Sequence, residues 1–128
     1  MYKPFEYYAV VLSEEWTKNL LAEFSYLGFD PSRTFAHHMT ILHRSRPNAE
    51  LQDWAEKHLG ELYHLKAIKL GVSDKAVALE VFSHVPCANA RPHITLATKG
   101  SGKPVDSNYI TEWVPIEPFE IQGSVTRF

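Results

Sequence analysis

The organisation of this 128-residue chain follows from two stretches, Ala36-His37-His38-Met39-Thr40-Ile41 and Pro92-His93-Ile94-Thr95-Leu96-Ala97. Each contains a histidine, any residue and then a threonine, within an apolar run of strand length. In a β-strand, side chains two residues apart point to the same face. The histidine and the threonine of each stretch therefore share a face. If the two strands lie side by side, two imidazoles and two hydroxyls converge on one place.

These four side chains, His38, Thr40, His93 and Thr95, are the predicted catalytic residues. Imidazole has an ordinary pKa of about 6.5, so two of them can act as base and acid near neutral pH. Two threonine hydroxyls can donate hydrogen bonds to an anion. The combination indicates a site that cleaves a phosphodiester. The alternative is that the histidines are structural and bond only to backbone or water.

The composition fits one globular domain over residues 1–128, built from two small lobes. The net charge of −2 offers no general attraction for long nucleic acids, whose binding depends on phosphate neutralisation. A pocket for a small or end-bound phosphate is therefore favoured. The single cysteine, Cys87, excludes an internal disulfide, and no apolar run reaches the roughly 20 residues that span a bilayer. We expect a cytoplasmic monomer without membrane association.

Hydrophobic periodicity predicts an α+β fold with largely antiparallel sheet. A helix is expected from Glu14 to Leu27, a second between Asn48 and Gly60, and a short one that ends near Trp113. Each lobe is expected to give one motif strand to a central cleft. The predicted strands cover residues 7–12, 37–43, 63–72, 77–82, 93–98 and 119–125.

The two motifs resemble the signature of the 2H phosphoesterase superfamily, and within it the cyclic phosphodiesterase domain of fungal and plant tRNA ligases. Residues 38–44 and 92–98 carry the resemblance, and residues 77–81 and 103–108 add to it. It implies a bilobal fold in which two antiparallel sheets face a central cleft, with helices outside.

The resemblance also implies an activity: hydrolysis of nucleoside or RNA-terminal 2′,3′-cyclic phosphates to 2′-phosphates, without metal or cofactor. In that reaction His93 would activate water and His38 would protonate the leaving O3′, although the sequence leaves open the reverse assignment. Two alternatives remain. One is a viral or host hydrolase of 3′–5′ linked cyclic nucleotide or oligonucleotide signals, and the other is a non-catalytic module that binds RNA ends or nucleotides.

Further residues are candidates for substrate binding. Tyr8, or its neighbour Tyr7, could stack on a base, although a place in the core is more typical of such a strand. Arg44 follows the first motif, and Lys99 and Lys103 follow the second. These cations either hold a phosphate or are solvated loop charges.

Two more histidines flank the first motif. His37 is expected on the opposite face from His38, which favours a structural role. His43 also lies out of phase with His38, but its place in the family-like pattern makes it a candidate for substrate binding. The helical H-E-x-x-H spacing of zinc proteases is absent, so no metal site is predicted.

Overall fold

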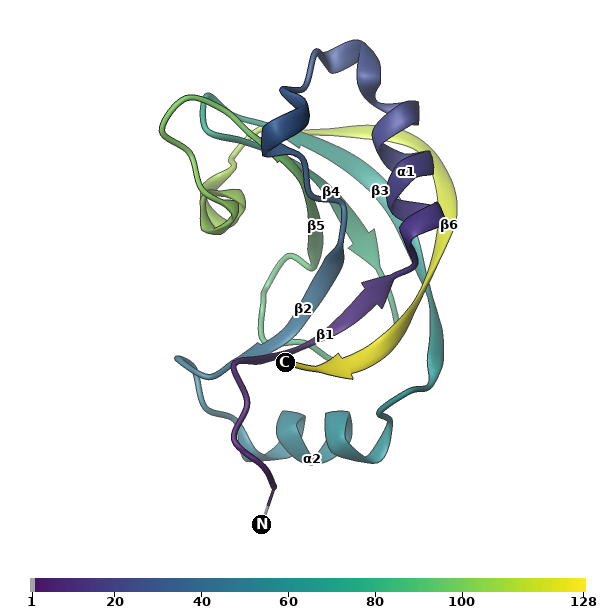
Figure 1. Ribbon diagram of the computed structural model, residues 1–128, viewed down its shortest axis with the longest axis vertical. Coiled ribbons are helices and arrows are strands. Elements are labelled where there is room, and N and C mark those ends of the chain that lie inside the picture. The colour runs from purple at the N-terminus through teal and green to yellow at the C-terminus, as the bar shows by residue number, and fades with distance from the viewer. Residues whose placement is uncertain (1) are drawn as a thin grey trace.

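A computed structural model describes residues 2–128, which form a closed antiparallel barrel in the strand order β1-β2-β5-β4-β3-β6 (Figure 1). The strands are β1 (Tyr7–Leu12), β2 (His38–His43), β3 (Leu62–Val72), β4 (Ala76–Phe82), β5 (His93–Thr98) and β6 (Trp113–Arg127). The helical segments are α1 (Glu14–Glu23), α2 (Ala49–Lys57) and the short 3₁₀ helices η1 (Ser25–Leu27), η2 (Pro31–Arg33) and η3 (Pro104–Tyr109). No helix within residues 2–128 is long and apolar enough to cross a membrane.

The predicted antiparallel sheet is confirmed, with differences at the ends of elements. The first helix stops at Glu23 and continues as η1 up to Gly28, whose left-handed φ of 76° ends it. The last strand begins at Trp113 instead of residue 119 and runs through Pro115 and Pro118. Only residues 123–127 of β6 pair with β1. The earlier part of β6 therefore has a partner on one side only, where missing N–H groups of proline are tolerated.

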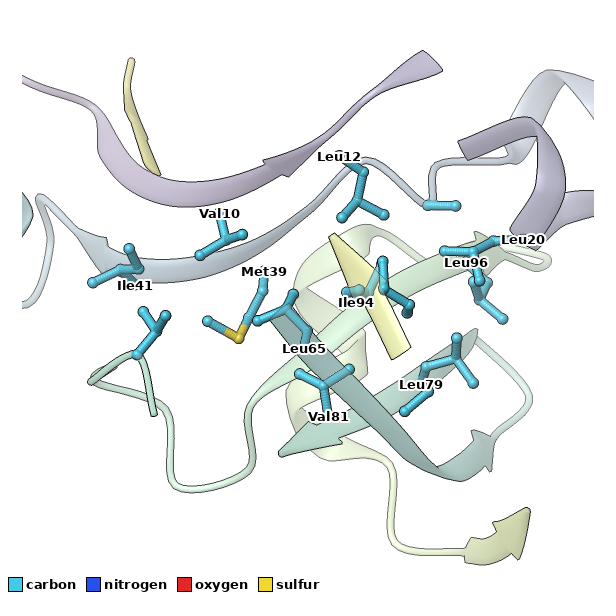
Figure 2. Packing of buried hydrophobic residues seen from close by; sticks show 14 of the residues in the cluster. Val10, Leu12, Leu20, Met39, Ile41, Leu65, Leu79, Val81, Ile94 and Leu96 are labelled. Carbon is cyan, nitrogen blue, oxygen red and sulfur yellow. The ribbon is translucent and has the colours of Figure 1, made fainter. Parts of the chain in front are cut away.

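The core consists of one face of every strand. Met39 of β2 and Ile94 of β5 are fully buried and point into the same cluster as Val10, Leu65 and Val81 (Figure 2). Burying an aliphatic side chain of this size contributes about 1.5–3 kcal/mol. Helix α2 lies across one end of the barrel, and α1 continues from the end of β1 toward the opposite end (Figure 1). The core face of each strand fixes, by alternation, which side chains face away from it.

The pairing between neighbouring strands of the barrel is shortest where the two motif strands meet. Strands β2 and β5 are joined by one residue pair, Met39 with Ile94, whereas β3 and β6 pair over most of their length. The expected two sheets are therefore connected into a single closed barrel, and the motif strands lie at its narrowest junction.

Candidate functional site

The structure brings both motif strands together as neighbours. Because Met39 and Ile94 form an antiparallel pair and are both buried, the residues on either side of each point to the opposite face. All four predicted catalytic side chains therefore lie on one face, and all four are partly exposed; they are His38, Thr40, His93 and Thr95. Alternation along a strand was sufficient to predict this shared face.

A backbone irregularity precedes the first motif. The N–H groups of Phe35 and Ala36 donate to the carbonyls of Leu96 and Thr95, at 2.8 Å each. Ala36 has a φ of 54°, which is unusual for a residue with a side chain. The Thr17 hydroxyl also donates to the Ala36 carbonyl at 2.8 Å. The chain thus pairs with β5, turns at Ala36, and resumes as β2 only at His38. Strained conformations of this kind occur often at functional sites.

The turn at Ala36 places His37 beside His38. The Nδ1 atoms of the two rings are 3.0 Å apart, and the rings meet edge to face with centroids separated by 5.2 Å. The expectation that His37 points to the opposite face is wrong, because strict alternation begins only after the turn. His37 is exposed, whereas His38 is partly buried.

The His38 imidazole is held on a second side by Tyr7 of β1. The two rings stack with centroids 5.1 Å apart at an interplanar angle of 28°. Burial, followed by the nearby charges of His37 and His93, lowers the pKa of His38 to about 4. His38 is therefore neutral at pH 7 in the unliganded protein.

The second motif histidine has a different partner. Nδ1 of His93 lies 2.9 Å from the carbonyl oxygen of Arg91, and because a carbonyl only accepts, Nδ1 carries the proton. Burial lowers the pKa of His93, and the bond to Arg91 opposes that effect. Arg91 is itself held by an ion pair with Glu80 and by the Trp113 ring, 4.9 Å from its guanidinium carbon. Neutral His93 thus presents a lone pair on Nε2.

Thr95 has a buried hydroxyl partner. Its Oγ1 is 2.8 Å from Oγ of Ser107, which belongs to η3 and is 1% exposed. If Ser107 donates, the Thr95 proton is free for a ligand. Ser107 belongs to residues 103–108, which add to the family resemblance, but no residue pattern predicts its contact with Thr95, because it lies on a separate short helix twelve residues further along the chain.

The His43 side chain also lies on the face of the barrel that carries the motif residues. Strict alternation from His38 predicts the opposite face. The register of β1 and β2 shifts between Tyr8 and Ala9, so that β2 contains one additional residue. Consequently His43 pairs with Tyr7, and their rings are nearly parallel with centroids 6.5 Å apart. A β-bulge of this kind reverses alternation and has no clear signature in the sequence.

The other substrate-binding candidates have different surroundings. Tyr8 is fully buried, and its hydroxyl donates to Glu56 at 2.5 Å, so Tyr7 is the tyrosine beside His38. Arg44 is exposed and pairs with Glu6 at 3.0 Å. Lys99 and Lys103 are exposed on the loop after β5. The structure thus gathers Tyr7 and His43 around the first motif, and leaves Tyr8 in the core.

A groove of about 620 Å³ lies where α1 meets β1 and β6. Its lining includes Val11, which pairs with His38 in the adjacent strand, and Ser124, which pairs with Val11. Trp16 and Asn19 of α1 form another wall. None of the four motif side chains lines this groove. Within residues 2–128, no three His, Cys, Asp or Glu side chains are arranged to hold a metal ion.

Comparison with known proteins shows the fold. No protein-family model and no curated protein sequence matches this chain. Among solved structures 44 chains match, including the crystal structure of a fungal RNA kinase, with a TM-score of 0.65 and 15% sequence identity. The alignment covers 85% of this chain and 35% of the RNA kinase chain. This chain thus spans about a third of that protein, and the likeness is one of fold.

Proposed function

We propose that this protein is a metal-independent phosphodiesterase that hydrolyses 2′,3′-cyclic phosphates of nucleosides or RNA ends. The observation that carries the proposal is the pairing of Met39 with Ile94, which places two His-x-Thr motifs on one face. The fold likeness to a fungal RNA kinase supports the inclusion of RNA ends among the substrates. The single-pair junction between β2 and β5 supports a two-lobed arrangement of the 2H phosphoesterase kind, with one motif in each lobe.

The hydrogen bonds support His93 as the base. Its lone pair on Nε2 takes a proton from water, and the water oxygen attacks phosphorus. The P–O3′ bond then breaks, and His38 donates a proton to O3′, which leaves a 2′-phosphate. General acid–base catalysis of this type contributes about 10²–10⁴ in rate.

The hydroxyls of Thr40 and Thr95 would stabilise negative charge on the non-bridging oxygens. Hydrogen-bond donors placed where charge develops contribute about 10²–10³ in kcat each. The bond between Thr95 and Ser107 orients one of these hydroxyls. Tyr7 stacks on His38 and His43 lies beside Tyr7, and these two side chains are the proposed contacts to the rest of the nucleotide.

A product assay tests this function. The protein is incubated in EDTA with 2′,3′-cyclic AMP, with an RNA that ends in a 2′,3′-cyclic phosphate, and with 3′–5′ cyclic dinucleotides. We expect 2′-phosphate products from the first two, and a loss of at least about 10³-fold in kcat for His38→Ala and for His93→Ala. His84→Ala serves as the matched control and should retain activity, because His84 is exposed in the loop that follows β4.

Each other outcome contradicts a part of the proposal. Cleavage of the dinucleotides alone would favour a hydrolase of cyclic nucleotide signals. Binding without turnover would favour a nucleotide-binding module. Activity that EDTA removes would contradict a metal-independent reaction, and full activity in either motif variant would contradict the residue assignment.

A further inference from the structure

The adjacent histidines of the first motif form a path from solvent to the site. Their Nδ1 atoms lie 3.0 Å apart, so one nitrogen carries a proton and the other accepts it. His37 is exposed at the outer end, and His38 is partly buried at the inner end. The Phe128 ring packs near His37 with centroids 6.2 Å apart, and the Tyr7 ring stacks on His38. These contacts fix the two rings relative to each other.

The two motif histidines differ in what their Nδ1 partner can do. The Arg91 carbonyl accepts only, which fixes the Nδ1 proton of His93. The partner of His38 is another imidazole, which can donate as well as accept. When His37 donates, neutral His38 carries its proton on Nε2, where an acid needs it. Burial makes a second proton on His38 unfavourable at neutral pH, so a supply from outside is required.

We propose, on the basis of the function above, that His37 is a positioning residue that donates to His38 and passes a solvent proton to the leaving oxygen. As the P–O3′ bond breaks, O3′ takes the proton from Nε2 of His38. In the same step Nδ1 of His38 takes the proton from Nδ1 of His37, and Nε2 of His37 takes one from solvent. His93 returns the proton of the attacking water to solvent. After the product leaves, Nε2 of His38 takes a proton from solvent, its Nδ1 proton returns to Nδ1 of His37, and Nε2 of His37 releases its proton, so both starting tautomers are restored and protons balance over the cycle.

The surroundings of His38 are consistent with this transfer. The titratable groups facing it are His37 on the preceding segment, Tyr7 on β1 and His93 on β5. Phe128, beside His37, is uncharged. The two other imidazoles both disfavour a lasting positive charge on His38. His37 therefore supplies the proton during the reaction, and does not leave it stored on His38.

Two measurements test the proposal. Nitrogen-15 NMR at pH 7 should show the His38 proton on Nε2 in the wild type, and loss of that preference in His37→Ala. In turnover of 2′,3′-cyclic AMP, we expect His37→Ala to lower kcat about 10–100-fold with little change in KM, and added imidazole to restore it. His37→Asn can donate but cannot pass a proton, so it should keep the tautomer and show the lowered kcat.

The control His84→Ala should keep both the tautomer and kcat. A His38 proton on Nδ1 in the wild type, or wild-type kcat in His37→Ala, would overturn the proposal. The NMR result does not depend on activity. A protein with the expected tautomer but no turnover of any substrate would therefore contradict the phosphodiesterase function and leave the His37–His38 geometry standing.

Discussion

Burial of His38 links the chemistry of the site to stability. Its pKa is about 4 in the folded protein, against an ordinary value of 6.5. Between these values the unfolded chain binds more protons, so the free energy of unfolding falls as pH drops from about 6.5 to about 4. The full effect is about 3 kcal/mol, from 1.36 kcal/mol per pKa unit. The buried, neutral His38 imidazole that the proposed site requires therefore lowers the free energy of unfolding at acid pH.

We therefore predict that His38→Asn weakens the dependence of stability on pH. Urea unfolding between pH 7 and pH 4.5 should show a smaller loss for this variant than for the wild type. His84→Asn, at an exposed histidine, should follow the wild type. Parallel curves for His38→Asn and the wild type would show that His38 titrates normally in the folded protein.

Sequence patterns predicted the motif side chains better than their partners. Alternation placed the histidine and threonine of each motif on one face, because β2 and β5 are regular there. It failed at His37, where the backbone turns at Ala36, and at His43, beyond the bulge in β2. At both places a single residue interrupts the two-residue alternation of the strand. The position of such an interruption is determined by long-range strand pairing and not by the local sequence.

At the scale of elements, regular segments were predictable and their ends were less so. Gly28 marks the end of the first helical region as expected, since its positive φ suits glycine. The early start of β6 was missed, because Pro115 and Pro118 usually interrupt strands. A strand can continue through a proline where the strand has no hydrogen-bonding partner on one side. Which part of β6 lacks such a partner follows from the order of strands in the barrel.

The loop between β5 and η3 is held by close backbone contacts. Arg33 donates to Thr98 Oγ1 at 3.2 Å and to the carbonyls of Gly100 and Gly102. A Cβ on Gly102 would lie 2.0 Å from the backbone oxygen of Lys75. The loop that follows the second motif is therefore a packed element that requires glycine at this position.

Gly102→Ala should accordingly lower the free energy of unfolding by about 1–3 kcal/mol, since backbone must move to relieve the overlap. Ser101→Ala, at the neighbouring exposed position, should change it by less than about 0.5 kcal/mol. Chemical denaturation of both variants measures the difference. Equal stability of Gly102→Ala and the wild type would mean that the loop does not pack against Lys75.

At the scale of the whole molecule, the site exists because the barrel closes. His38 and His93 are 55 residues apart in the sequence, and the pairing of Met39 with Ile94 brings their strands together. Periodicity predicted antiparallel strands and two motif strands facing one cleft. It could not predict that a single pair joins them, because strands distant in the sequence pair only through closure of the barrel, which local periodicity does not encode.

The central claim is that both motifs contact the same phosphate. A crystal structure of the protein with bound 2′-AMP tests it most directly. We predict phosphate oxygens within about 3.2 Å of Nε2 of His38, Nε2 of His93 and the hydroxyls of Thr40 and Thr95. A phosphate that contacts only one motif, or that binds elsewhere on the protein, would contradict it.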